Sequence, residues 1–159
     1  MKTGKFITPL DYRDLDGENW QLLGHLDYYC PSLKGIIRAQ KGFVTDLASI
    51  PRFFHRIIPK SGPHNYAAVI HDWLYRNGGV VCLIRESGEM VAIRLSRKAC
   101  DDIFREAMKA SKPDELPKSK TPAWQRVLIY TGVRAGGFVP WNDVERRLSG
   151  TDISNPCAE

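Results

Sequence analysis

The stretch from His71 to Tyr75, which reads His-Asp-Trp-Leu-Tyr, holds the residues best suited to chemistry. On a helix, positions four apart lie on one face, so His71 and Tyr75 come one turn apart while Asp72 lies about 100° round the axis. Apolar residues fill most of the positions around them, which predicts that His71 is partly buried. An adjacent carboxylate or phenol can fix the tautomer of a buried histidine and tune its pKa for general-base work. The pattern predicts either a catalytic histidine or a core histidine satisfied by a carbonyl group.

A second carboxylate comes from the segment 97–109, which we expect to be a helix capped by Ser96. Asp101 lies on the side of its apolar positions, whereas Asp102 shares the outer side with charged residues. An inward carboxylate is costly to bury unless it accepts a hydrogen bond, for example from imidazole or phenol. We therefore expect Asp101 to meet His71. The alternative is a surface position in the first turn that favours the helix dipole.

The elements that must position these residues indicate an α+β fold. Segments 20–29 and 35–39 are rich in aromatic and β-branched residues and are bounded by turn clusters, which is typical of an antiparallel sheet. Residues 80–95 alternate around Ser87-Gly88 and predict a β-hairpin inserted between helices. Helices are expected at 49–58, 65–76 (capped by Asn65), 97–109 and 123–135. We expect an N-terminal antiparallel β-sheet followed by a three- to four-helix half.

The last expected helix carries an apolar face of Trp124, Val127 and Leu128. A helix lying on a membrane would show a cleaner split, with its cations along one side. We therefore expect this face to pack against the two preceding helices, and residues 136–141 to break the helix.

Length and composition indicate one domain. A chain of 159 residues, 43% of them hydrophobic, can bury a core without disulfides or metal. We expect a single α+β domain over residues 1–148 and a polar flexible tail over 149–159. The four cysteines show no metal-type spacing, and we expect free thiols in a reducing compartment or fillers of the core. The chain shows no signal peptide and no apolar run long enough to cross a bilayer.

The net charge of +5 is unevenly spread along the chain. Between Lys34 and Lys60, six cations stand against one anion, Asp46. Such a segment fits an ordinary solvated face, or a surface for an anionic membrane, a nucleic acid or an acidic protein. The aromatic residues of the expected strands lie mostly outside it, which argues against nucleic acid.

Three segments, 42–52, 67–75 and 96–104, occur in the order typical of one known family. They resemble an uncharacterised family of phage and prophage proteins known as domain of unknown function 1353. The resemblance covers about residues 35–137. It implies a viral protein located in the host cytoplasm or the virion, with other phage proteins as partners, and it brings no established activity.

A more distant resemblance is to phospholipase A2. That family has a helix reading His-Asp-x-x-Tyr and a second, antiparallel helix that supplies an aspartate to the same histidine. The resemblance implies that His71 is the general base that activates water, that Asp101 orients it and that Tyr75 is a supporting hydroxyl. The implied reaction is hydrolysis of the sn-2 ester of a glycerophospholipid, at an anionic membrane surface during entry or lysis.

The same resemblance implies a calcium ion that polarises the ester carbonyl as a Lewis acid. Asp72 would be one ligand, and a loop at 60–65 with its single glycine, Gly62, would supply carbonyls toward the six to eight oxygens that calcium prefers. Asp46 is a further candidate ligand. A loop carboxylate before a helix is also a common turn former, which is the alternative for Asp46.

These residues also fit a non-enzymatic phage structural protein of the virion or tail, or a host-interaction protein. In that hypothesis the His, Asp and Tyr side chains form a buried polar network that fixes the packing. The two hypotheses differ in what they require of His71. A catalytic histidine must open onto a cleft with room for water and a carbonyl group, whereas a structural one is sealed.

Overall fold

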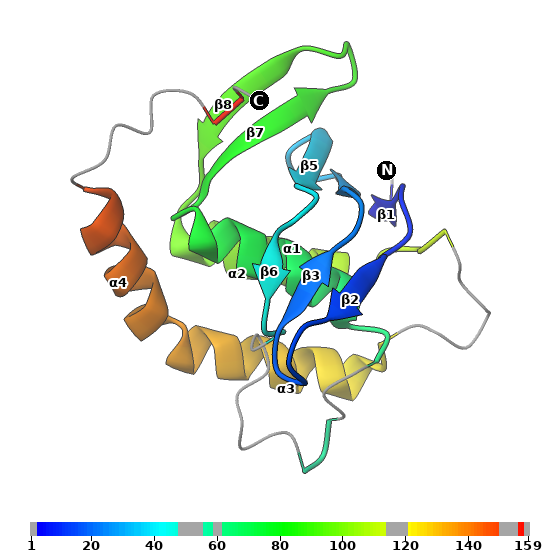
Figure 1. Ribbon diagram of the computed structural model, residues 1–159, viewed down its shortest axis with the longest axis vertical. Helices are drawn as coiled ribbons and strands as arrows, with labels where there is room; N and C mark the ends of the chain where they lie inside the picture. Colours follow the sequence, from blue (N-terminus) through cyan, green and yellow to red (C-terminus); the bar gives the residue numbers. More distant parts are fainter. Residues whose placement is uncertain (1–2, 48–55, 59–61, 114–120, 150–155, 158–159) are drawn as a thin grey trace.

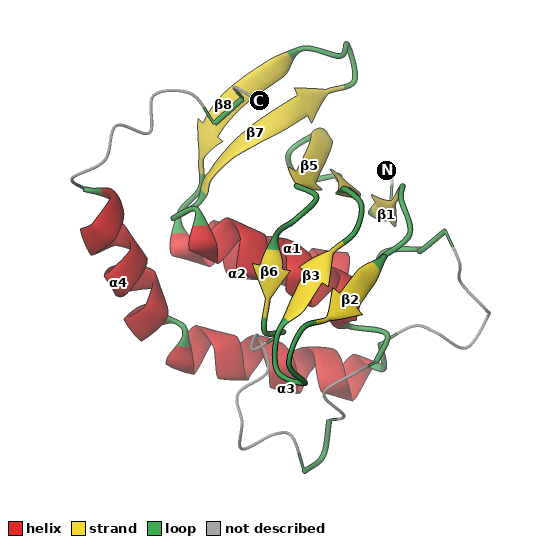
Figure 2. Cartoon of the chain, in the orientation of Figure 1, coloured by secondary structure: helices red, strands yellow, loops and turns green. Residues whose placement is uncertain are grey.

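The computed structural model describes residues 3–47, 56–58, 62–113, 121–149 and 156–157, without the side chain of Phe138. Figures 1 and 2 show strands in the first part of the chain, then helices, with one hairpin between the first two helices. The expected α+β class, an N-terminal antiparallel sheet followed by a helical half, is confirmed. No helix in this described part is long and apolar enough to cross a membrane.

The strands and helices of the described residues have the following bounds. The strands are β1 (Lys5–Phe6), β2 (Tyr12–Asp14), β3 (Trp20–Leu22), β4 (Leu26–Cys30), β5 (Gly35–Ala39), β6 (Val44–Thr45), β7 (Val80–Arg85) and β8 (Met90–Arg94). The helices are α1 (Asn65–Arg76), α2 (Arg97–Ala107), α3 (Ala123–Gly136) and α4 (Phe138–Leu148).

The strands form two antiparallel sheets. The larger has the order β1-β4-β5-β7-β8, and the smaller has the order β2-β3-β6. The expected hairpin at 80–95 is therefore confirmed, and because β7 also pairs with β5 it extends the N-terminal sheet. At its base, the Leu95 amide donates to the Gly79 carbonyl. Gly79 has φ +75°, and a Cβ there would lie 2.1 Å from the Leu95 carbonyl oxygen, so this junction requires glycine.

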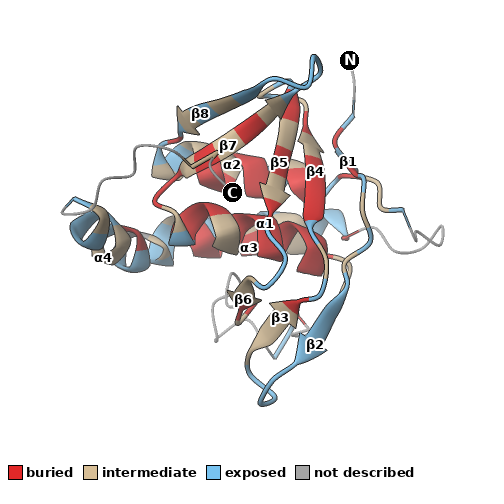
Figure 3. Ribbon diagram, turned by 45° about the horizontal axis from the view of Figure 1, so that its top comes forward, coloured by how far each residue is buried: buried red, intermediate tan, exposed pale blue. Residues whose placement is uncertain are grey.

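Helices α1 and α2 pack on one face of the larger sheet, and Figure 3 shows their buried surfaces under β4 and β5. The core combines alternate strand residues such as Tyr28 and Ile37 with helix residues such as Ile70 and Phe104, all fully buried. Helix α1 is buried at most of its positions, as its apolar sequence predicts.

Contacts between α1 and α2 give their relative direction. Tyr75, near the end of α1, donates a hydrogen bond to Asp101 in the first half of α2. His71, one turn earlier in α1, stacks on Phe104, about one turn later in α2. The two helices therefore run antiparallel, as the sequence predicted.

The helix ends differ in part from expectation. Ser96 caps α2 by accepting from the Ala99 amide, as predicted. Asn65 is not the cap of α1, because His64 occupies that position and the Asn65 side chain instead accepts from the Gly62 amide. Of the helix expected at 49–58, residues 49–55 lie outside the described part of the chain, and 56–58 form a turn.

The end of α3 is partly as expected, and its buried face corrects a prediction. The helix ends at Gly136, which confirms a break at this point, but the break is confined to Gly137 because α4 begins at Phe138. Pro140 lies in the first turn of α4, where a helix does not need its amide. Trp124 and Val127 are 53% and 59% exposed, so they do not pack inward as expected. The fully buried residues of α3 are Ile129, Gly132 and Val133, while Leu128 is partly buried.

The prediction that the four cysteines are free thiols or fillers of the core is only partly right. Cys82 of β7 and Cys157 form a disulfide across 75 residues of sequence, so these two are not free thiols. Their spacing gave no signal because the pairing depends on the chain after α4 returning to the sheet. Cys30 and Cys100 are free and buried, which confirms them as core fillers. The flexibility expected for 149–159 stays a prediction, since 150–155 and 158–159 lie outside the described residues.

Replacing both Cys82 and Cys157 by serine is expected to lower the free energy of unfolding by about 4 kcal/mol, because the crosslink restricts a 75-residue loop in the unfolded chain. The Tm of the oxidised wild type and of the double variant measures the effect. A reductant should lower the Tm of the wild type to that of the variant and leave the variant unchanged. Equal Tm values with and without the bond would contradict the prediction.

Candidate functional site

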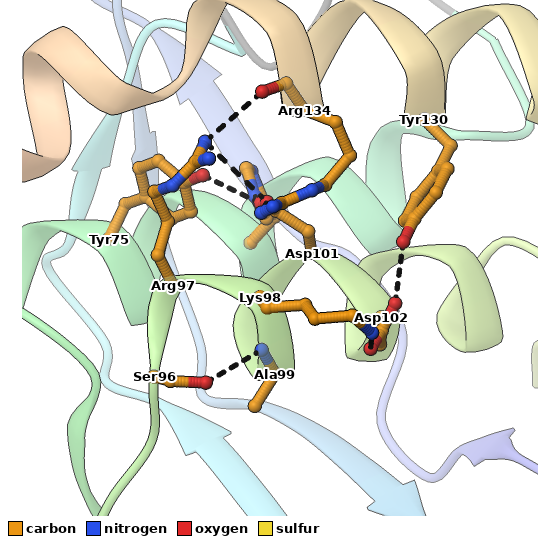
Figure 4. A network of polar contacts seen from close by, with 10 residues as sticks. Tyr75, Ser96, Arg97, Lys98, Ala99, Asp101, Asp102, Tyr130 and Arg134 are labelled. Carbon is orange, nitrogen blue, oxygen red and sulfur yellow. Dashed lines mark hydrogen bonds and ion pairs between the residues drawn. The ribbon is translucent and has the colours of Figure 1, made fainter.

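The carboxylate of Asp101 is fully buried where α1, α2 and α3 meet. Its Oδ1 accepts hydrogen bonds from the Tyr75 hydroxyl at 2.6 Å and binds His71 Nε2 at 3.0 Å. Its Oδ2 accepts from the Arg134 guanidinium at 2.6 Å, and Arg97 lies 3.9 Å from the same oxygen. Figure 4 shows Tyr75, Arg97 and Arg134 converging on Asp101. The predicted inward position of Asp101 is confirmed.

Electrostatics keep Asp101 ionised. Burial by itself would raise the pKa of this carboxyl, but the hydrogen bonds from His71, Tyr75 and Arg134 outweigh it and hold the pKa below its ordinary value. An ionised carboxylate can only accept, so His71 must carry a proton on Nε2. In neutral His71 the basic lone pair is therefore on Nδ1.

Two aromatic rings hold the imidazole of His71. The Phe104 ring stacks on it at 4.6 Å between centroids with an angle of 23°, and the Tyr75 ring lies 4.2 Å away at 44°. His71 is only 3% exposed. Burial and the bond to Asp101 raise the pKa of Tyr75, so this phenol stays protonated and remains a donor.

His71 nevertheless borders a pocket of about 490 Å³ between α1 and the α3–α4 region. Three other predicted site residues, Asp46, Asp72 and Tyr75, line the same pocket. Its remaining lining residues are Arg76, Gly132, Val133, Gly136, Gly137, Pro140, Asp143, Val144 and Arg147. The structure therefore brings most of the predicted site residues to one concave surface, with Asp101 buried behind His71.

The residues Asp72 and Asp46 reach the pocket from different elements. Asp72 lies on α1 and accepts a hydrogen bond from the Thr45 hydroxyl at the end of β6. That hydroxyl also accepts from the Leu47 amide, so the chain around Asp46 is held against α1. The smaller sheet thus positions one edge of the pocket.

The predicted calcium ligands are only partly brought together. Gly62 is not among the pocket residues, and its amide and carbonyl both bond to Asn65 in the turn before α1. Although Asp46, Asp72 and Asp143 all border the pocket, the described residues contain no group of three or more His, Cys, Asp or Glu placed to hold a metal. Calcium stays a prediction.

Sequence reasoning missed Arg134 and the contribution of α4. Arg134 and Tyr130 lie one turn apart on α3 and bind the neighbouring residues Asp101 and Asp102 of α2. This i,i+4 polar pair facing two aspartates was the available signal. Gly137 lies at the junction of α3 and α4, where a Cβ would lie 2.6 Å from the Tyr75 hydroxyl and only glycine permits this approach.

Comparison with known families bears on this site. Residues 20–133 match the model of a family described as protein of unknown function (DUF1353). The chain belongs to this family. The matched residues of this DUF1353 protein include His71, Tyr75 and Asp101 but end just before Arg134 and α4. No curated protein and no solved structure matches the chain.

A second buried histidine of the DUF1353 protein lies outside this network. His64, at the start of α1, is 1% exposed, and neither ring nitrogen has a hydrogen-bond partner. Burial, followed by the charge of Lys112, lowers the pKa of His64 to about 4. The folded protein therefore favours its neutral form.

Replacing Tyr75 by phenylalanine is expected to lower the free energy of unfolding by about 1.5–3 kcal/mol, because it removes a buried hydrogen bond to an ionised group. Urea unfolding at neutral pH measures the loss. The matched control is Tyr29→Phe, whose hydroxyl binds Glu86 at the surface. Its loss should stay within about 0.5 kcal/mol. Equal losses in the two variants would contradict the assigned role of Tyr75.

His64 predicts a pH dependence of stability. Its folded pKa of about 4 lies below the ordinary 6.5, so its contribution is lost as pH falls from about 6.5 to about 4. The full loss is about 3 kcal/mol. His64→Leu should flatten the profile of unfolding free energy in this window, whereas His25→Leu, which changes an exposed histidine, should keep it. A His64→Leu profile parallel to that of the wild type would rule out this origin.

Proposed function

We propose that this DUF1353 protein is a hydrolase in which His71 is the general base and the substrate is a phospholipid ester. One observation carries the proposal: His71 borders the pocket while its Nε2 is bound to the buried, ionised Asp101. A histidine that is oriented by a buried carboxylate and borders a concave surface is suited to the activation of water. The proposed setting is a phage protein that acts at the host membrane during entry or lysis.

The chemistry follows from the tautomer of His71. Nδ1 takes a proton from a water in the pocket, and the resulting hydroxide attacks the ester carbonyl carbon. The imidazolium that forms is stabilised by Asp101, whose Oδ1 it already faces at 3.0 Å. Arg134 and Tyr75 lower the basicity of Asp101, so the proton on Nε2 stays on the ring. His71 then returns its proton to the leaving alkoxide.

Calcium has a limited place in this proposal. Asp72 and Asp46 are the carboxylates that a calcium ion would use at the pocket, and the ion would polarise the ester carbonyl. Calcium takes six to eight oxygen ligands, and the described residues alone do not complete such a site. Every step above therefore uses the side chains of the chain itself.

A second candidate is a non-enzymatic phage structural or host-interaction protein. The near-complete burial of His71 and Asp101 favours it, at 3% and 0% exposed. In this candidate the network serves only to fix how α1, α2 and α3 pack, since a buried carboxylate demands partners at defined positions.

The variant His71→Gln separates the two candidates, because the Gln amide can still donate to Asp101 but cannot act as a base. Vesicles of equal parts phosphatidylglycerol and phosphatidylcholine serve as substrate, and fatty-acid release is followed with calcium and with chelator. We expect release by the wild type, and a loss of about 100-fold or more in His71→Gln. The Tm should stay close to that of the wild type, and His25→Gln should retain activity.

Three results would count against the proposal in different ways. Absence of release by the wild type, with and without calcium, overturns the proposal. If His71→Ala also lowers the Tm strongly while His71→Gln does not, the network candidate is supported. Equal release by the wild type and His71→Gln would show that another group acts as the base.

A further inference from the structure

Helix α3 presents an uncharged row of residues to solvent. Trp124, Val127, Thr131 and Ala135 are all exposed, and their spacing of three or four residues places them on one face. Val139, in the first turn of α4 just after α3 ends, is exposed as well. Trp124, Val127 and Val139 are 53%, 59% and 52% exposed, which is high for large apolar side chains. We call these five residues the α3 stripe.

The α3 stripe is not needed for the core. A surface helix normally turns its apolar face inward and its charged face outward. In α3 the inward face is supplied by Ile129, Gly132 and Val133, and the stripe is a second apolar face on the opposite side. An exposed row of apolar side chains on one helix face is a candidate interaction site.

A row of cations lies beside α3. Lys98 and Arg105 on the outer side of α2, with Lys109 just beyond its end, are exposed. Lys98 pairs with Asp102, the one anion of the row, so the excess of positive charge comes from Arg105 and Lys109. The row is joined to α3 through Tyr130, whose hydroxyl donates to Asp102 and whose ring lies 5.1 Å from the Arg105 guanidinium. Figure 4 shows Tyr130, Asp102 and Lys98 together at this junction.

We propose that the α3 stripe and the neighbouring cations of α2 form a docking surface for an anionic lipid bilayer. Tryptophan is favoured at the boundary between headgroups and acyl chains, and lysine and arginine beside it attract anionic headgroups. The positive charge of the cations beside the stripe favours an anionic bilayer as the binding partner. A second copy of the chain is disfavoured, because its own cations would face those of the first.

The stripe also reaches the rim of the pocket. Ala135 and Val139 of the stripe are each followed in sequence by a pocket residue, Gly136 and Pro140. A bilayer bound along α3 would therefore lie beside the entrance to the pocket that His71 borders. The delivery of lipid to His71 rests on the proposed function, whereas the docking surface rests on α2 and α3 alone.

Vesicle binding tests the docking surface. The full chain is sedimented with vesicles of phosphatidylcholine alone or mixed equally with phosphatidylglycerol. We expect binding to the mixed vesicles, a fall of about tenfold or more in Trp124→Ser/Val127→Ser, and a smaller fall in Lys98→Gln/Arg105→Gln. The matched control is Leu23→Ser/Met90→Ser, which removes two apolar side chains of 44% and 55% exposure on other elements. It should bind like the wild type.

Three results overturn the inference. They are no binding of the wild type to mixed vesicles, equal binding of the wild type and Trp124→Ser/Val127→Ser, and a wild-type dimer in solution that this variant converts to monomer without any vesicle binding. The emission of Trp124 is a further check, because its blue shift on mixed vesicles should be lost in Trp124→Phe. That variant retains an apolar ring and so keeps the fold.

Failure of this inference and failure of the proposed function are distinguishable. Binding is measured without turnover, so His71→Gln should bind vesicles like the wild type. Stripe-dependent binding without fatty-acid release supports the docking surface and opposes hydrolysis. Release that is unchanged in Trp124→Ser/Val127→Ser supports hydrolysis and overturns the delivery of lipid along the α3 stripe, while the docking surface itself is decided by vesicle binding.

Discussion

The buried negative charge of Asp101 is the constraint on which the helical half depends. An ionised carboxylate removed from water is tolerated only when donors and opposite charge surround it. Here the donors come from α1 and α3 while the carboxylate belongs to α2. A shift of any one helix would leave a charge without compensation. The need of the Asp101 carboxylate for donors at defined positions fixes how the three helices pack. The same hydrogen bonds also fix the orientation of the His71 ring.

The part of this arrangement that could be predicted from the sequence is the part set by helical periodicity. Asp101 points inward and Asp102 outward because the apolar residues around them repeat at the helical spacing. The same rule brings His71 and Tyr75 to one face and makes Asp101 their natural partner. Arg134 could not be placed in this way. Helix α3 is apolar on two sides, and only the tertiary packing decides which side is buried.

Features that depend on contacts between distant parts of the chain could not be predicted from local sequence patterns. The bond between Cys82 and Cys157 depends on where the chain returns after α4, which no spacing encodes. Gly136-Gly137 indicates the end of a helix, and α3 does end there, but local patterns did not show that α4 begins at once at Phe138 or that Gly137 lies against the Tyr75 hydroxyl. In both cases a locally flexible or unremarkable residue has its role fixed by a partner far away in sequence. The expected strands and hairpin, in contrast, needed only local alternation and turn residues.

The position of α4 has a consequence for comparisons within the family. The match to DUF1353 ends at residue 133, so it contains the histidine and its carboxylate but none of the α4 residues that form the opposite wall of the pocket. The shape of that wall, and the charge that Asp143 and Arg147 bring to it, can diverge between relatives while the matched segment stays the same. Members can therefore share the buried network of His71, Tyr75 and Asp101 and differ in the wall of the pocket that faces it.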